Sequence, residues 1–326
     1  MVTKAVVLCG GLATRFLPYS KAQPKEMLTI VDKPIIDYII EELYLSGIKE
    51  VLIIVGRGKE SIINYFDKNI ELENALIKSG KFKEVAQLNK IHSMLKIYYT
   101  RQIEPKGTGH CIKLAKEWVK NEPFVLLYGD EIFYNEQMSR TQQLIDGFNK
   151  AEQSIIAVKP VPMSEVHKYG IIKTDRTAYK KESENLQFAT ECSNGKMPVN
   201  ISVNGLNATA WPINKQNILK VLRIVEKPDK KNAPGNLSYI GAGVFNGDIF
   251  KYTDKLPDTG GEILVTDALN EMAQAGELNA IKLAGERFDV GDAEGFLKAN
   301  IFMGLKSKKY RDSLKEFIKE LLPIKK

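Results

Sequence analysis

The stretch that decides the fold of this chain is residues 4–28, KAVVLCGGLATRFLPYSKAQPKEML. It opens with a short, mostly apolar run at residues 4–8, which is typical of a buried strand. The run leads directly into two glycines, an arginine and two lysines with little apolar cover. Because open α/β sheets bind ligands where loops leave the carboxyl ends of parallel strands, we treat residues 9–28 as a candidate binding loop.

The residue types in the binding loop suit an anionic ligand. Gly10 and Gly11 allow backbone N–H groups to approach a phosphate closely, and Arg15 offers a planar fork of donors that matches phosphate oxygens. Lys25 follows Pro24, whose fixed φ limits the directions that the lysine can take. Two nucleotide-binding spellings, G-x-G-x-x-G and G-x-x-x-x-G-K-[ST], do not occur in the chain. By residue type alone, a phosphate site and a tight turn with surface charges both remain open.

Apolar strands alternate with amphipathic helices along most of the chain. The helix expected after the binding loop has Asp32 as its N-cap and Gly47 as its C-terminal stop. The apolar runs at 51–55 and 124–128 predict further buried strands. This alternation predicts an α/β fold with a mainly parallel sheet covered by helices on both faces.

Two segments depart from this alternation. Residues 174–222 are polar and rich in asparagine, and apolar residues alternate there about an Asn204-Gly205 pair, which predicts a β-hairpin. We interpret 174–222 as an inserted β-rich element of a main domain over 1–305. Residues 306–326 predict a basic amphipathic helix. Its expected apolar face holds Leu314, Phe317, Ile318, Leu321 and Leu322.

Composition disfavours several classes of protein. The chain has 326 residues, of which 44% are hydrophobic and 27% charged, as in globular proteins. No apolar run approaches the roughly 20 residues of a membrane span, and the N-terminus lacks a secretory signal, so a cytoplasmic location away from the membrane is expected. The net charge is +7, but residues 306–326 hold eight Lys/Arg and three Asp/Glu, so nucleic-acid binding is disfavoured. Three widely spaced cysteines argue against a disulfide framework or a zinc site.

Ten segments of the chain, in order, resemble one enzyme family. The binding loop is similar to the signature of sugar-1-phosphate nucleotidyltransferases, G-x-G-T-R followed by P-K. The other nine segments are MLTIVDKPIIDYIIEE, GRGKESIINYFD, ELENAL, RQIEPKGTGH, KYGII, VEKP, APGNL, GGEILVTDAL and FDVGD. Over about residues 3–300 they resemble the bacterial UTP–glucose-1-phosphate uridylyltransferases. The resemblance implies a Rossmann-like three-layer α/β/α domain, a divalent metal taken as Mg²⁺, and synthesis of UDP-glucose and pyrophosphate from UTP and α-D-glucose 1-phosphate.

The resemblance implies catalytic roles for three cations. Arg15 and Lys25 hold the triphosphate and steady the leaving pyrophosphate, while Lys227, in VEKP, holds the phosphate of the sugar. The attacking phosphate is already an anion near neutral pH, because the second pKa of a phosphate monoester is about 6. No catalytic base is therefore required, and the chemical problem is to bring anions together.

The resemblance also implies binding roles. Asp130, at the end of a strand, is expected to contact the nucleotide and to bind Mg²⁺ as a hard oxygen ligand, with Asp289 as a second metal-linked aspartate. Gln102 is expected to contact uracil, although a carboxamide can flip to match cytosine, so its chemistry alone does not choose the base. Glu226 is expected to accept hydrogen bonds from glucose hydroxyls. The remaining expected nucleotide-binding residues are Gly10, Gly11 and Gly107, and the remaining sugar-binding residues are Gly170 and Gly241.

One letter of the signature departs from the family pattern. Ala13 stands at the second glycine, so either the loop keeps φ negative there or the phosphate grip is altered. His110 is expected to be structural, because no proton transfer needs it. The expected partners are UTP and glucose 1-phosphate, with the protein forming a homodimer or homotetramer. Two alternatives stay open: a related enzyme that uses dTTP or another hexose 1-phosphate, and a non-enzymatic homologue that binds UDP-sugar.

Overall fold

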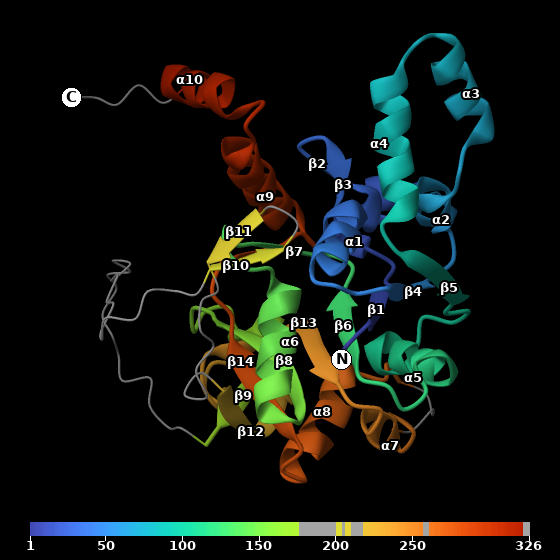
Figure 1. The fold of residues 1–326 in the computed structure, drawn as a ribbon. Coiled ribbons are helices and arrows are strands. Elements are labelled where there is room, and N and C mark those ends of the chain that lie inside the picture. The colour runs from blue at the N-terminus through green and yellow to red at the C-terminus, as the bar shows by residue number, and fades with distance from the viewer. Residues whose placement is uncertain (176–199, 204–205, 210–217, 257–260, 322–326) are drawn as a thin grey trace.

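A nine-stranded sheet forms the centre of the molecule in the computed structural model, which describes residues 1–175, 200–203, 206–209, 218–256 and 261–321 (Figure 1). The strand order is β5-β4-β1-β6-β13-β8-β14-β12-β9. The strands β12 and β13 run in the direction opposite to the other strands of this sheet, so the expected mixed α/β sheet is confirmed. The strands are β1 (Lys4–Cys9), β4 (Glu50–Val55), β5 (Lys96–Arg101), β6 (Phe124–Tyr128), β8 (Ser154–Pro160), β9 (Gly170–Thr174), β12 (Ile218–Glu226), β13 (Leu237–Phe245) and β14 (Leu278–Lys282).

Strand β1 sits between β4 and β6 and is parallel to both. Its register aligns Cys9 with Val55 on one side and Leu8 with Tyr128 on the other. The three strands therefore end at one edge of the sheet. The binding loop leaves this edge next to the loop that carries Asp130, which places two distant parts of the sequence side by side.

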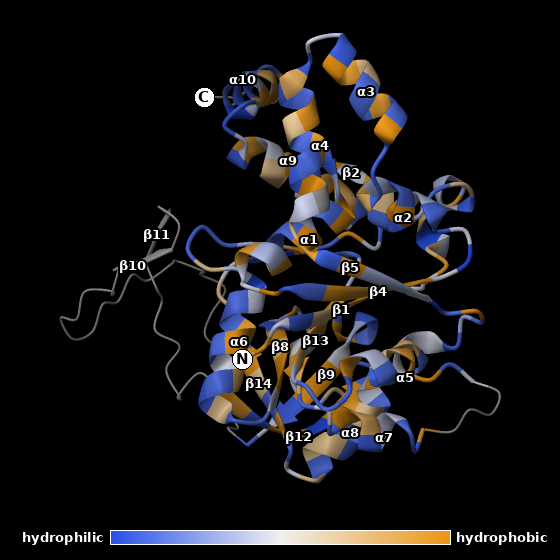
Figure 2. Cartoon of the chain, turned by 45° about the vertical axis from the view of Figure 1, so that its right-hand side comes forward, coloured by the Kyte–Doolittle hydropathy of each residue, from blue (hydrophilic) through white to orange (hydrophobic). Residues whose placement is uncertain are grey.

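Helices cover both faces of the sheet because the strands are apolar on both sides. Ala5 and Val7 point into one core and Val6 and Leu8 into the other, as the two-residue period of a strand requires. Figure 2 shows hydrophobic residues gathered in β8, β9 and β13 between these helices. The first core contains residues of α1 (Ile35–Leu45), α2 (Glu60–Phe66), α6 (Arg140–Ala151) and α9 (Ala293–Lys306); the second contains residues of α5 (Gly107–Val119), α7 (Ile249–Thr253) and α8 (Val265–Gln274).

Several shorter elements lie outside the central sheet. The strands β2 (Thr29–Ile30) and β3 (Lys33–Pro34) pair, as do β7 (Glu131–Tyr134) and β15 (Glu286–Asp289). The helices α3 (Ile70–Lys78) and α4 (Phe82–Ser93) project together from the body (Figure 1), and α10 (Arg311–Leu321) follows α9. No helix in the described ranges is long and apolar enough to cross a bilayer.

The start of α1 differs from the sequence prediction, whereas its end agrees. Asp32 is not the N-cap, because Thr29–Ile30 pairs with Lys33–Pro34 and makes Asp32 part of a hairpin turn, so the helix begins at Ile35. Gly47, with φ of 84°, follows the last turn of α1 as predicted.

The inserted segment is described only in part. The strands β10 (Asn200–Val203) and β11 (Leu206–Thr209) pair antiparallel, with Val203 opposite Leu206, as a hairpin requires. The predicted turn at Asn204-Gly205 lies outside the described residues, as does Leu322 of the predicted C-terminal face. Residues 218–222, which we assigned to the insertion, belong to β12 of the central sheet.

Candidate functional site

Two adjoining cavities open at the carboxyl edge of the sheet. The first, of about 830 Å³, is lined by predicted site residues Gly10, Gly11, Arg15, Lys25, Gln102, Gly107 and Asp130. The second, of about 630 Å³, is lined by the predicted residues Gly170, Glu226, Lys227, Gly241 and Asp289. Arg15 and Asp130 line both cavities. The fold therefore gathers every predicted site residue into one two-chambered site, which we call the nucleotide cavity and the sugar cavity after the residues predicted for each.

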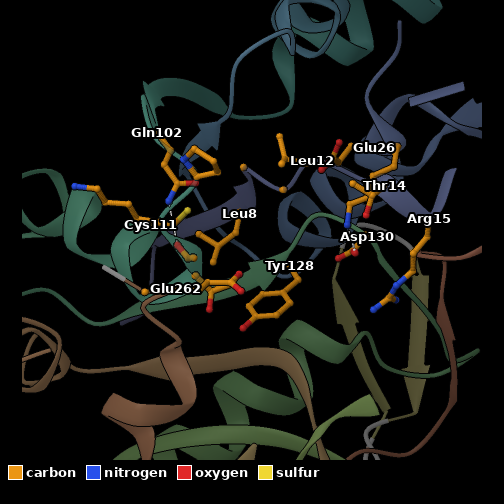
Figure 3. A pocket seen from close by; sticks show the side chains of 18 residues that line it. Leu8, Leu12, Thr14, Arg15, Glu26, Gln102, Cys111, Tyr128, Asp130 and Glu262 are labelled. Atoms are coloured by element: carbon orange, nitrogen blue, oxygen red, sulfur yellow. Dashed lines mark hydrogen bonds and ion pairs between the residues drawn. The ribbon is translucent and has the colours of Figure 1, made fainter. Parts of the chain in front are cut away.

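The nucleotide cavity has a polar end and a charged end. In Figure 3, Gln102 lies on one side of the cavity, while Arg15 and Asp130 lie on the other. Gln102 directly follows β5, and Asp130 lies in the turn between β6 and β7. An elongated ligand with a hydrogen-bonding head and an anionic tail matches this arrangement.

The binding loop uses the left-handed backbone region at Ala13. Ala13 has φ of 54° and ψ of 39°, which excludes the first of the two alternatives, that the loop keeps φ negative there. For a residue with a Cβ this conformation costs roughly 1–2 kcal/mol. The loop thus keeps, with alanine, the conformation for which glycine is best suited.

A glycine is needed at position 10 because a neighbouring side chain leaves no room for a Cβ, and not because of the φ of Gly10. A Cβ on Gly10 would lie 2.5 Å from Oε1 of Gln102 and 3.3 Å from Sγ of Cys111. A Cβ on Gly11, in contrast, would meet no atom within 4 Å. The first glycine therefore makes room for Gln102, and the second leaves the cavity open.

Lys25 and Asp130 form an ion pair across the charged end of the cavity. Burial alone lowers the pKa of Lys25, but the carboxylates of Asp130 and Glu26 outweigh it and raise that pKa above its ordinary value. Burial alone raises the pKa of Asp130, and the ammonium of Lys25 outweighs it and lowers that pKa. Both side chains are therefore charged near neutral pH, and each stabilises the other inside the site.

A second ion pair, between Lys59 and Glu26, lies next to the first. The sequence analysis did not predict it. Nζ of Lys59 lies 2.7 Å from both carboxylate oxygens of Glu26, and the two residues are 6% and 1% exposed. Cγ of Glu26 lies so close to Gly129 that a Cβ there would be 3.2 Å away. The pair thus joins the binding loop, the loop before α2 and the turn that presents Asp130. Its only sequence signal was a charged residue in each of two family segments, PKEM and GRGK.

The second predicted aspartate lies beside the first. Asp289 is the residue of β15 that pairs with Glu131, which directly follows Asp130. A Cβ on Gly291 would be 2.9 Å from Oδ1 of Asp289 and 3.1 Å from Oδ2 of Asp130, so the two carboxylates flank the same point. The backbone N–H of Gly291 donates to Oδ1 of Asp289 at 3.0 Å. This contact holds Asp289 facing Asp130.

The two aspartates are the residues here that could hold a cation. No group of three or more His, Cys, Asp and Glu forms a closed metal site in the described part of the chain. Mg²⁺ does not need one, since it commonly binds one or two carboxylates and keeps water and phosphate oxygens as its other ligands. The donor set of Asp130 and Asp289 therefore fits Mg²⁺. Asp292, in contrast, accepts the N–H of Gly295 at 2.9 Å and caps α9.

The sugar cavity is built where β9, β12 and β13 meet. Glu226 pairs with Gly170 across the sheet, and a Cβ on Gly170 would be 3.1 Å from Oε2 of Glu226 and 3.0 Å from Cγ2 of Thr266. Oγ1 of Thr266 is buried and makes no hydrogen bond with any of the described residues. Glu226 therefore brings an acceptor to this wall and Thr266 its methyl group, while the hydroxyl of Thr266 is buried away from it. The role of Thr266 was not predicted, because a lone threonine in a helix carries no distinctive signal.

The backbone shapes the remainder of the sugar cavity. Gly241, with φ of 63°, lies in an irregular stretch of β13, and a Cβ there would collide with the ring of Tyr128. Lys227 has φ of 43°, and its backbone N–H donates to the carbonyl of Tyr169 at 3.0 Å. Its ammonium lies 3.8 Å from Oε1 of Glu226 and its side chain is 55% exposed. Lys227 thus lines the sugar cavity with a largely exposed ammonium, which can reorient toward an anion.

Comparisons with known proteins identify the family of this chain. A family model described as nucleotidyl transferase matches residues 4–189 and 207–304, with its gap inside the inserted segment. The UTP–glucose-1-phosphate uridylyltransferase of Bacillus subtilis is 37% identical over 322 residues, covering 98% of this chain and 97% of that protein. The solved structure of a UTP-bound UGPase from Acinetobacter baumannii has a TM-score of 0.81 and 31% identity, covering 99% of this chain and 100% of that one. A UDP-glucose pyrophosphorylase solved with UDP-glucose has a TM-score of 0.74 and 30% identity, covering 94% and 100% of the two chains.

The strain at Ala13 predicts a stabilising substitution. Ala13→Gly should raise the free energy of unfolding by up to about 1 kcal/mol, because relief of the left-handed strain exceeds the extra entropy of an unfolded glycine. The matched control is Ala22→Gly in the same loop, where φ is −111° and no strain exists, so that variant should lose stability. Urea unfolding measures both, and a less stable Ala13→Gly variant would contradict the assignment of strain.

The buried pair beneath the binding loop predicts non-additive effects on stability. Lys59→Met should cost about 3–5 kcal/mol, because it leaves the carboxylate of Glu26 buried without a partner. Glu26→Gln combined with Lys59→Met should recover much of that loss. The exposed pair Lys298–Glu294 serves as the control, and Lys298→Met should leave stability unchanged. Equal losses in the single and double variants would show that the pair is not coupled.

Proposed function

Because this chain belongs to the nucleotidyl transferase family, we propose that it transfers a uridylyl group from UTP to α-D-glucose 1-phosphate, forming UDP-glucose and releasing pyrophosphate. One observation carries the proposal: two cavities share a wall at Arg15 and Asp130. The reaction joins two substrates through a phosphorus atom, so it needs two such chambers that meet where the phosphates lie. The named relatives and the titles of the solved neighbours support UTP and UDP-glucose as the ligands.

The site supplies the charge that the reaction needs. An oxygen of the sugar phosphate attacks the α-phosphorus of UTP, the bond from that phosphorus to the β-phosphate oxygen breaks, and pyrophosphate leaves. Arg15 and Lys25 hold the triphosphate at the charged end of the nucleotide cavity, and Lys227 holds the phosphate of the sugar. Because the nucleophile is already ionised, these cations act by positioning and by neutralising charge. Gln102 lies at the far end, where the base belongs.

We propose Mg²⁺ as the metal, held by Asp130 and Asp289 together with phosphate oxygens and water. Two facing carboxylates support this assignment, since the ion prefers hard oxygen ligands. When bound, the ion supplies positive charge that neutralises phosphate oxygens. Asp130 would then hold the ion as well as pairing with the ammonium of Lys25.

Glucose is proposed to lie against the wall formed by Glu226, Gly170 and Thr266. The carboxylate of Glu226 accepts hydrogen bonds from sugar hydroxyls, and the methyl group of Thr266 packs beside it. Gly170 leaves the space between them free of side-chain atoms. This wall is where the choice among hexose 1-phosphates is made.

Finer features of the architecture belong to the same proposal. The two cores on opposite faces of the sheet support a three-layer α/β/α arrangement of the main domain.

The helix α10 exposes 55% of Phe317 and 62% of Leu321 on an amphipathic surface, which supports a subunit contact in a homodimer or homotetramer. Sedimentation velocity checks the assembly, and a monomer at micromolar concentration would rule it out.

The proposed reaction predicts a defined substrate pattern. Purified protein with Mg²⁺ should release pyrophosphate from UTP and glucose 1-phosphate, and EDTA should abolish this release. The assay should compare UTP, dTTP, CTP and ATP against several hexose 1-phosphates. A higher kcat/KM for dTTP or for another sugar phosphate would favour the related enzyme, and no release from any pair would contradict an enzymatic function.

The phosphate-binding role predicts a large effect of Lys25. Lys25→Met should lower kcat/KM for UTP by on the order of 10²-fold, because one preorganised cation at a developing charge is worth that much. The matched control is Lys21→Met, an exposed lysine of the same loop that lines neither cavity, and it should keep the parent rate. Unchanged turnover in Lys25→Met would refute the assignment of the triphosphate clamp.

A further inference from the structure

The amide of Gln102 is held in one place by the fold. Its backbone N–H donates to the carbonyl of Val55 at 2.9 Å, which fixes the residue at the carboxyl edge of the sheet. Its side chain is 4% exposed and extends toward the first turn of α5. Any rotation of this amide therefore takes place in a confined space, where its neighbours decide which end faces the cavity.

Two acceptors fix the nitrogen end of this amide. Nε2 lies 3.0 Å from the carbonyl oxygen of Gly107 and 3.0 Å from Nδ1 of His110. A backbone carbonyl can only accept, so the group that faces Gly107 is the NH₂. Nδ1 of His110 must then accept the second N–H, because two donors cannot face each other. The neutral tautomer with its proton on Nε2 of His110 satisfies this requirement.

The oxygen end of the amide is left for the ligand. Oε1 lies against Gly10, at the position where a Cβ would be 2.5 Å away, and Gly10 lines the nucleotide cavity. Among the described residues, the amide makes its hydrogen bonds through Nε2. The group presented to the base is therefore an acceptor and not a donor.

We propose that His110 is a positioning residue that sets base selectivity by locking the amide of Gln102 with its oxygen toward the base. The proposal rests on the proposed uridylyl transfer and says which feature selects uracil. Uracil and thymine present N3–H, which donates to a fixed Oε1. Cytosine presents an unprotonated N3, whose lone pair would face the lone pairs of Oε1.

Gly107 already favours this orientation of the amide, and His110 adds a second hydrogen bond that favours it. Without His110, a flipped amide loses the hydrogen bond to Gly107 and sets Oε1 against that carbonyl, but it gains a donor that matches N3 of cytosine. With His110 in place, the flip breaks two hydrogen bonds and sets Oε1 against two acceptors. Each of these changes disfavours the flipped state.

The position of His110 is itself fixed by backbone contacts. The first turn of α5 is tied to the segment before α8 by three hydrogen bonds, from Gly109 N–H to the carbonyl of Ile263 at 2.8 Å, from Ile263 N–H to the carbonyl of Lys106 at 2.9 Å, and from Val265 N–H to Oγ1 of Thr108 at 3.1 Å. The backbone that carries the imidazole is therefore fixed. The imidazole can then hold the amide of Gln102 in one orientation.

The test is the ratio of kcat/KM for UTP to that for CTP. In His110→Leu this ratio should fall on the order of tenfold, through a lower value for UTP and a higher value for CTP, since one orienting hydrogen bond is lost. In His110→Asn the ratio should be retained, because Oδ1 of asparagine can accept in place of Nδ1. Glu117→Leu is the matched control, an exposed residue two turns further along α5, and it should keep the ratio of the parent protein.

The outcomes separate this inference from the proposed function. If the parent protein releases no pyrophosphate with UTP, the proposed function fails. If the parent prefers UTP and His110→Leu keeps that preference, the inference fails and the function stands. Equal loss of preference in His110→Asn and His110→Leu would also overturn it, because an acceptor would then not be what matters.

A measurement on the parent protein reports the tautomer of His110 directly. The chain has three histidines, so ¹⁵N-labelled imidazole spectra can be assigned by comparison with His110→Asn. Near pH 8, Nδ1 of His110 should show the shift of an unprotonated nitrogen that accepts a hydrogen bond, and Nε2 should carry the proton. An Nδ1–H tautomer would overturn the inference.

Discussion

The ion pair between Lys25 and Asp130 is the interaction on which the site depends. A site for phosphates needs cations in a partly buried cavity, and an unpaired buried cation is costly. Asp130 offsets that cost by pairing with Lys25. The Glu26–Lys59 pair in turn fixes the loop that carries Lys25. The cavity can therefore hold a positive charge without destabilising the fold.

This arrangement follows from the order of the strands. Because β1 and β6 are parallel neighbours, the binding loop and Asp130 emerge at the same edge. Pairing of β15 with β7 brings Asp289 to Asp130, and pairing of β12 with β9 brings Glu226 to Gly170. The two cavities meet because these pairings converge. The chemistry of the shared wall is thus a consequence of sheet topology.

The same neighbourhood assigns different tasks to residues of similar type. Lys25 and Glu26 both line the nucleotide cavity, but Lys25 pairs with Asp130 while both carboxylate oxygens of Glu26 pair with Lys59. Asp289 faces Asp130, while Asp292 caps α9. Gln102 could present either end of its amide, and only Gly107 and His110 decide which. In each case the neighbours, and not the residue type, determine the function that the side chain can serve.

The sequence by itself determined the fold class and the family, because apolar periodicity reports burial and ten ordered segments match one family. It also predicted the residues that the fold gathers around the two cavities. It also placed the end of α1 correctly at Gly47. Only the tertiary structure decided that Asp32 lies in a hairpin, that Ala13 takes the left-handed conformation, and that Glu26 pairs with Lys59. These features depend on contacts between strands and loops far apart in the chain, which a local pattern does not contain. The orientation of Gln102 is of the same kind, since its partners lie across a turn that only the folded chain closes.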